Sequence, residues 1–351
     1  MFRRSLSLLG RRLCFRYRTV KFTPHPDKIE TGGDDAFLSL DGALSVLDGV
    51  SWWKDNAGVD AGLYSAAMAR AMYDYIEDEL FGDIPVTSFR LLDRAYEQCK
   101  HSEVQGTCTA LVATLQEPKE DIHAKDGYTL VQLDEDAGSA NLTDLDNPLL
   151  DVVSVGDCSL MVLRYGKIIY RTEEQAHAMD FPFQLGTGSK DTPSSGIKVL
   201  VPVQPGDVVV MGSDGIFDNV YPERILEAVW PPLEKVYTQF EWSDAKGVSV
   251  SLQSSTIRNV NIRNELADSI MAALEVGGKL CVEEAINVSK DIRSDSPYAA
   301  KCIEDGALYE GGKPDDMTLL LSVIGIGDNE SSGERFSGSE ISFPIPYRDW
   351  P

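Results

Sequence analysis

Apolar residues in the first hundred positions recur with two different periods. FLSL and ALSVL, two short apolar runs on either side of Asp41 and Gly42, predict a β-hairpin. Residues 59–80 then carry apolar side chains at helical spacing, and residues 87–101 do the same after Thr87, a candidate N-cap. The pattern therefore predicts a hairpin followed by two helices.

The middle of the chain is rich in β-forming runs separated by Gly, Pro and Asp turns. These runs are CTALVATL, LLDVVSV, SLMVLRY, KIIYR, IKVLVPV and DVVVMGS. Residues 222–236 and 256–291 are helical in pattern, SPYAAKCIEDG opens a further short helix, and MTLLLSVIGI ends the series as a strand. This interleaving favours one domain with two packed sheets inside and helices outside.

Three segments lack such periodicity. Residues 117–149 form an acidic, turn-rich insertion, residues 240–256 are polar, and residues 326–351 resemble a polar C-terminal tail. No window approaches 18 consecutive apolar residues, so we expect no integral membrane segment.

The N-terminus has a composition of its own. It is rich in Arg, Ser and Leu and has no acidic residue before Asp27, which is typical of an organellar transit segment. We expect residues 1–25 to direct the chain to the mitochondrial matrix, to be cleaved and to belong to no fold. A basic tail on a cytoplasmic protein is the alternative.

Charge is distributed unevenly along the 351 residues. The net charge is −24, but the first 21 residues carry seven basic side chains and no acid, which leaves −31 for the rest. So acidic a body repels phosphate backbones and anionic lipid, which argues against nucleic acid as a partner. Six cysteines without a CxxC pair argue against a disulfide framework or a structural zinc site.

Acidic residues recur where apolar runs begin or end. The five places are GGDDAF, SVLDGV, VVSVGDCS, VMGSDGIFD and GGKPDDMTLLL, which contain Asp34 and Asp35, Asp48, Asp157, Asp214 and Asp218, and Asp315 and Asp316. Carboxylates beside a packed core are costly to desolvate unless cations or hydrogen-bond donors accompany them. No Lys or Arg stands at matching positions along the sequence, so we expect hard divalent cations, which prefer oxygen ligands.

Two other interpretations of the sequence are less favourable than a metal site. A single Asp-Gly after a strand is usually only a turn, but five acidic strand ends together favour a metal site. Cys158 and Arg164 have the C-x5-R spacing of cysteine-dependent phosphatases. The residues between them form an apolar strand, whereas that chemistry needs a glycine-rich loop at a helix N-terminus.

TGGDD, LDGVSWW, VGDCS, GSDGIFDN and GGKPDDMT resemble, in order and spacing, the metal-binding motifs of the protein phosphatase 2C family, also called metal-dependent PPM phosphatases. SPYAAKCIEDG, QGTCTALVA and DFPFQLGTG extend the resemblance over about residues 30–325, and it is greatest to the mitochondrial, SpoIIE-like branch. The resemblance implies an α+β fold, a four-layer αββα sandwich of two central, mainly antiparallel β-sheets flanked by α-helices, with residues 26–325 as the catalytic domain.

The resemblance also implies a role for each acidic position. Two Mn²⁺ or Mg²⁺ ions would be held by the side chains of Asp48, Asp214 and Asp315 and by the carbonyl of Gly49. Asp34 and Asp35 would hold metal-bound waters, Asp157 and Asp218 would help to hold a third, weaker ion, and Asp316 would lie behind these ligands.

The implied activity is hydrolysis of phosphoserine and phosphothreonine in a phosphoprotein substrate by a metal-activated water, carried out by a monomer. Three departures keep a second hypothesis open. Val50 stands where many members have a histidine, Glu30 stands where many have a phosphate-binding arginine, and Ser51 and Trp52 replace two glycines. The alternative is a catalytically weak or silent phosphatase-like protein that binds a partner or a phosphopeptide.

Overall fold

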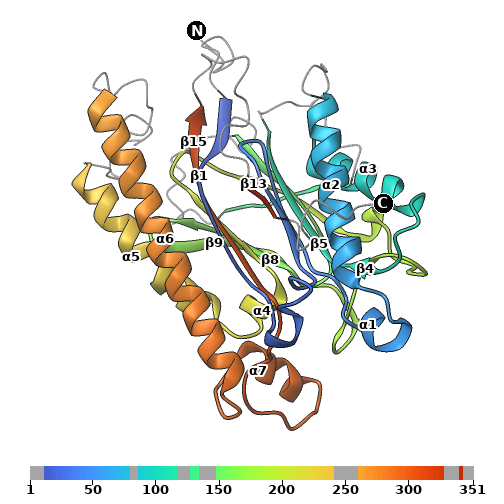
Figure 1. Cartoon of the computed structure of the whole chain (residues 1–351). Coiled ribbons are helices and arrows are strands. Elements are labelled where there is room, and N and C mark those ends of the chain that lie inside the picture. Colours follow the sequence, from blue (N-terminus) through green and yellow to red (C-terminus); the bar gives the residue numbers. More distant parts are fainter. Residues whose placement is uncertain are drawn as a thin grey trace.

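The structure is a computed structural model of the chain, and it describes residues 12–79, 86–116, 127–133, 148–240, 260–327 and 340–342. Two β-sheets are packed face to face, with helices on both outer sides (Figure 1). The four-layer αββα sandwich expected from the resemblance is confirmed.

The first sheet has the strand order β1-β15-β14-β8-β9, and every neighbouring pair is antiparallel. Its strands are β1 (Arg12–Thr23), β15 (Met317–Gly327), β14 (Val208–Gly212), β8 (Ser159–Arg164) and β9 (Lys167–Arg171). Helices α5 (Pro222–Gln239) and α6 (Val260–Lys290) cover its outer face.

The second sheet has the order β16-β2-β3-β5-β7-β13-β6, in which only the β13–β6 pair is parallel. Its strands are β16 (Glu340–Ser342), β2 (Ala36–Ser39), β3 (Ala43–Leu47), β5 (Ala110–Gln116), β7 (Leu149–Val155), β13 (Ile197–Pro202) and β6 (Thr129–Leu130). Helices α2 (Ala61–Glu79) and α3 (Ser88–Lys100) cover its outer face, and Thr87 caps α3 by accepting a hydrogen bond from the Arg90 N–H.

Side-chain alternation builds three cores from these layers. On β14, Val208 and Val210 face the helices, whereas Val209 and Met211 face the other sheet. On β5, Val112 contacts the α2 and α3 layer, and its neighbours face the centre of the sandwich. Because both faces of the central strands are buried, these strands are predominantly apolar, as their sequences suggest.

Short elements complete the fold. They are η2 (Pro26–Lys28), α1 (Trp52–Ala57), η4 (Pro193–Ser195), α4 (Asp214–Phe217), α7 (Pro297–Glu304), the strand pair β10 (Ala176–Ala178) and β11 (Phe181–Pro182), and the pair β4 (Thr107–Cys108) and β12 (Leu185–Gly186). Within the described ranges, no helix is long and apolar enough to cross a membrane.

Two expectations at the chain ends were wrong. Residues 12–23 are not outside the fold, because they form β1, which pairs with β15 along its whole length and buries Phe15 completely. The expected tail also contributes β16, which pairs with β2. The basic side chains concealed the N-terminal strand: they alternate with residues that face inwards, such as Phe15 and Tyr17. The other residues of the expected tail, and most of the acidic insertion, lie outside the described residues.

Candidate active site

Acidic residues from both sheets lie at one end of the sandwich, near α1, α4 and α7 (Figure 1). Asp34 and Asp35 precede β2, Asp48 follows β3, and Asp157 follows β7. From the other sheet, Asp214 begins α4 directly after β14, Asp218 ends that helix, and Asp315 and Asp316 precede β15. The fold thus brings all eight expected side chains to the same end.

Hydrogen bonds join the two sheets at this point. The Asp34 N–H donates to Asp316 Oδ2 at 2.7 Å, and the Thr318 hydroxyl donates to Asp35 Oδ2 at 2.6 Å. The Gly49 N–H donates to the Asp34 carbonyl at 3.1 Å. These contacts set the distance between the loops that carry the carboxylates.

Two glycines are required by this close approach. A Cβ on Gly49 would lie 2.5 Å from the Asp34 carbonyl oxygen, and a Cβ on Gly215 would lie 1.9 Å from the Asp316 carbonyl oxygen. Both obstacles are backbone atoms that no rotamer change can move. Each Asp-Gly step therefore serves packing between loops as well as turning the chain.

Three of the carboxylates have no ion pair within the described part of the chain: Asp35, Asp48 and Asp157. Burial raises the pKa of Asp48 well above its usual value, and the neighbouring carboxylates of Asp214 and Asp35 raise it further. Burial likewise raises the pKa of Asp35 and of Asp157, and the carboxylates of Asp316 and Asp214, respectively, raise it further. Burial and repulsion between neighbouring carboxylates thus both oppose ionisation of these three groups.

Asp214 and Asp218 are paired with lysines. Lys313 Nζ lies 2.6 Å from Asp214 Oδ2 and 3.0 Å from Asp218 Oδ2, and Lys301 Nζ lies 2.7 Å from Asp218 Oδ1. Burial opposes ionisation of Asp214, but the Lys313 ammonium holds its pKa below the usual value. The Lys313 ammonium thus favours the ionised form of Asp214.

A third lysine, Lys28, joins the acidic residues of both sheets. Its Nζ lies 2.7 Å from Asp34 Oδ2, 2.9 Å from Asp316 Oδ2 and 3.4 Å from Asp315 Oδ1. Burial opposes protonation of Lys28, yet the three carboxylates raise its pKa above the ordinary value. Burial together with Asp214 raises the pKa of Asp315 to about 6.

The expectation that no lysine neutralises the cluster was therefore wrong. Lys301 and Lys313 went unnoticed because their partners are distant in sequence, although Lys313 stands only two residues before Asp315. Helix α7 brings Lys301 to Asp218, and the loop before β15 brings Lys313 to α4. Lysines thus neutralise the edges of the cluster, whereas Asp35, Asp48 and Asp157 have no such partner among the described residues.

Ser51, Trp52 and Trp53, the SWW segment, block the acidic cluster less than the size of their side chains suggests. Ser51 donates to Asp34 Oδ2 at 3.0 Å and accepts from Lys28 Nζ at 2.9 Å. Trp52 is 57% exposed at the start of α1, and Trp53 donates its indole N–H to Thr107 Oγ1 at 2.8 Å. Ser51 is therefore a member of the site, while Trp53 anchors its loop to β4.

The oxygen donors fit a hard divalent cation in their chemistry. One carboxylate oxygen each of Asp35, Asp157 and Asp214 is buried without a hydrogen-bond partner, and such a desolvated oxygen is stabilised by a metal ion. In their present positions, no three Asp, Glu, His or Cys side chains in the described ranges converge as ligands of one ion.

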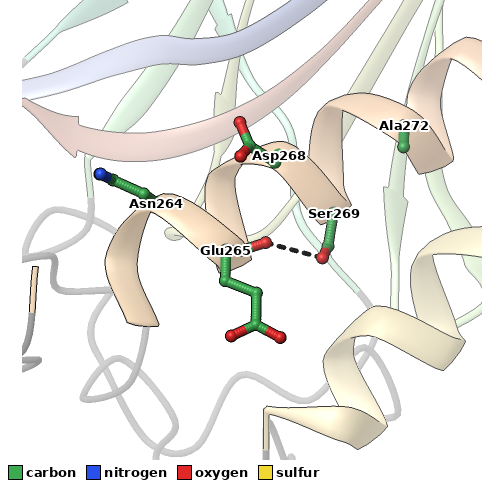
Figure 2. A pocket seen from close by; sticks show the side chains of 5 residues that line it. All are labelled: Asn264, Glu265, Asp268, Ser269 and Ala272. Atoms are coloured by element: carbon green, nitrogen blue, oxygen red, sulfur yellow. Dashed lines mark hydrogen bonds between the residues drawn. The ribbon is translucent and has the colours of Figure 1, made fainter. Parts of the chain in front are cut away.

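Two other features do not belong to this site. Cys158 is fully buried, and burial raises the pKa of its thiol well above the ordinary value, which is the opposite of what a nucleophilic cysteine needs. A cavity of about 480 Å³ is lined by Asn264, Glu265, Asp268, Ser269 and Ala272 near the start of α6 (Figure 2). The acidic cluster lies at the other end of the sandwich.

The chain is similar in sequence to several known proteins. No family model matches it. The Arabidopsis thaliana protein described as "Probable protein phosphatase 2C 55" is 29% identical over 312 residues, which is 88% of this chain and 52% of that protein. "Probable protein phosphatase 2C 26" of the same plant is 28% identical over 86% of this chain and 81% of its own length. The chain spans just over half the length of the first two relatives it matches.

A solved structure, that of the photosystem II phosphatase PBCP, shares the fold. Its TM-score is 0.61 at 24% identity, over 89% of this chain and 98% of that one. Sequence relatives, shared architecture and the order of acidic strand ends agree. The chain is similar in sequence and in fold to members of the protein phosphatase 2C family.

Proposed function

We propose that the chain is a metal-dependent phosphatase that hydrolyses phosphoserine and phosphothreonine in proteins. The observation that best supports this proposal is a set of three buried carboxylate oxygens without hydrogen-bond partners. They belong to Asp35, Asp157 and Asp214, which lie around the half-buried Asp48. A site that only stabilised the fold would gain nothing from concentrating unpaired carboxylates. Relatives described as protein phosphatases support the same activity.

The residues proposed to hold two Mn²⁺ or Mg²⁺ ions are Asp48, Asp214, Asp315 and the carbonyl of Gly49. Asp157 and Asp218 are proposed for a third, weaker ion. Such ions lower the pKa of a water towards neutrality and neutralise the oxygens of the phosphoryl group. This chain contributes the fixed carboxylates, and the strand ends of two sheets keep them in place.

The protein contributes little acid catalysis of its own in this proposal. Val50 occupies the position of the histidine found in many members, and no described histidine ring bonds to the carboxylates named above. Solvent is then the proton donor to the leaving alkoxide, so the rate falls steeply for substrates with poor leaving groups. Aryl phosphates are therefore expected to react faster than alkyl phosphates.

The test uses the full chain, because residues 12–23 are part of the first sheet. Hydrolysis of an aryl phosphate and of a phosphothreonine peptide is measured with Mn²⁺, with Mg²⁺ and with EDTA. We expect activity with the metals only, and a loss of about a hundredfold or more in Asp214→Asn, since even the partners of metal ligands typically contribute 10–100-fold.

Asp268→Asn on α6 is the matched control, because it makes the same chemical change on an exposed residue of the distant cavity. Its activity should equal that of the wild type. Absence of any metal-dependent rate would favour the second hypothesis, a silent binding protein. The lysine pairs of Asp214 and Asp218 are the observation that supports this alternative.

We further propose that the enzyme acts in the mitochondrial matrix, because its N-terminal segment is basic and contains no acidic residue before Asp27. We also propose that it acts as a monomer. Residues 1–25 fused to a fluorescent reporter should carry it to mitochondria. A reporter that stays in the cytosol would reject this assignment.

A further inference from the structure

The ammonium group of Lys28 has more partners than it has protons. Four oxygen atoms surround Nζ: those of Asp34, Ser51 and Asp316 lie within 2.9 Å, and that of Asp315 lies at 3.4 Å. An ammonium has three N–H donors, so none is left over for a further ligand. The side chain is only 11% exposed.

Lys28 is held at this place by contacts behind the site. Asp316 accepts hydrogen bonds from the His25 N–H and the Asp34 N–H, each at 2.7 Å, so its carboxylate is fixed independently of the lysine. The Lys28 carbonyl accepts from the N–H groups of Thr31, Gly32 and Gly33, which fixes the backbone at the end of η2. The ammonium therefore cannot move far from Asp34 and Asp315.

Lys313 differs in this respect. The two carboxylates that it contacts at hydrogen-bond distance, Asp214 and Asp218, belong to the site itself, and its side chain is 23% exposed. It has room to turn towards solvent when a cation arrives. The two lysines thus have unequal freedom to leave the site.

We propose that Lys28 is a built-in counter-ion that lowers the affinity of the Asp315 side of the site for a divalent cation, so that two ions bind with unequal affinity. A positive charge held 3.4 Å from Asp315 Oδ1 would repel a cation bound by that carboxylate and would compete with it for the oxygen. Asp48 has no ion pair among the described residues, so an ion held by Asp48 and the Gly49 carbonyl would meet no such competitor. Lys28 also stabilises the metal-free protein by pairing with both loops.

This inference rests on the metal-dependent function proposed above. Removing the charge has two consequences of opposite sign. The metal-free protein becomes less stable, because Asp34, Asp315 and Asp316 repel one another without a cation. The weaker metal site becomes tighter, because the competitor has gone. A merely structural lysine would produce the first effect without the second.

The experiment compares the full-length wild type with Lys28→Met, Lys28→Gln and Lys28→Arg. Mn²⁺ binding is followed by electron paramagnetic resonance of the free ion, and thermal unfolding is followed in EDTA. We expect the weaker Mn²⁺ dissociation constant to fall about tenfold in both neutral variants, which corresponds to removing one nearby charge in a partly screened site. Lys28→Arg should stay close to the wild type.

Lys54→Met is the matched control, since it removes one exposed lysine from the neighbouring helix α1 and makes the same change in net charge. It should leave both measurements unchanged. If Lys28→Met does not fold, Lys28→Gln decides, because its amide retains hydrogen bonds to the loops.

Equal Mn²⁺ affinity in the wild type and both neutral variants would overturn the inference and leave the proposed function intact. Equal affinity with a raised KM would instead make Lys28 a contact for the substrate. A wild type that binds no Mn²⁺ would overturn the proposed function as well, and the Asp214→Asn comparison would then show no metal-dependent rate to lose.

Discussion

Asp151 is an ionisable side chain buried completely in β7, with no ion pair in the described part of the chain. It accepts hydrogen bonds from the N–H and the hydroxyl of Ser88 at the start of α3. Burial nevertheless dominates and raises its pKa from 3.8 to about 6. The folded state therefore binds the Asp151 proton more tightly than the unfolded state does.

Asp151 is thus expected to lower the stability of the protein as pH rises. Its favourable contribution is complete below the unfolded pKa, near 4, and is lost as pH rises through about 6. We expect the free energy of unfolding of the wild type, minus that of Asp151→Asn, to fall by about 3 kcal/mol between pH 3.5 and pH 7. Urea denaturation at several pH values in EDTA measures this difference. A difference independent of pH would show that burial does not hold the proton.

At the residue scale, some side chains of the site could be predicted from the sequence and others could not. The positions of Asp48, Asp214 and Asp315 at strand ends could be predicted, because a break in apolar periodicity marks each one. The lysine partners could not, because Lys28, Lys301 and Lys313 reach their carboxylates only through the packing of the two sheets. The exposure of Trp52, which is 57%, also could not be predicted from its place in the SWW segment.

At the level of elements, α4 and the start of β15 approach each other most closely in the site. This four-residue helix carries Asp214 and packs against the start of β15, where Asp315 and Asp316 lie. Gly215 makes the junction possible, since a Cβ there would lie 1.9 Å from a backbone carbonyl. The separation of the segments that carry Asp214 and Asp315 therefore depends on the absence of one methyl group.

Gly215→Ala should destabilise the protein by about 3 kcal/mol or more, because a backbone clash is relieved only by moving α4 away from β15. The same movement should weaken Mn²⁺ binding, since it separates Asp214 from Asp315. Gly42→Ala in the β2–β3 turn is the control, because its Cβ would have nothing within 4 Å. Chemical denaturation and Mn²⁺ titration of both variants measure the two effects. A Gly215→Ala protein as stable as Gly42→Ala would contradict the packing argument.

For the whole molecule, the order of strands and helices and the αββα layering could be predicted, because long apolar runs and amphipathic helices give strong periodic signals. The same reasoning missed β1 and β16 at the chain ends. Arg12–Thr23 contains four basic residues, and its composition masks the alternation of buried and exposed side chains. The amino-acid composition of this segment indicated a targeting sequence. Its pairing as β1 depends on β15, which lies about three hundred residues later in the sequence and so leaves no local signal.

Strand β1 therefore sets a limit on how much of the N-terminus the folded protein can lose. It completes the edge of the first sheet and buries Phe15 and Tyr17 almost fully, which amounts to roughly 5 kcal/mol of apolar burial, comparable with the total stability of many domains. A chain that starts at residue 12 should be soluble and show cooperative unfolding by circular dichroism. A chain that starts at residue 24 should unfold at a much lower temperature or aggregate, because β15 is then an uncovered edge. Equal melting temperatures of the two chains would show that β1 is dispensable. If they differ as expected, any import cleavage must fall before Arg12, which is close to the middle of the segment assigned to targeting.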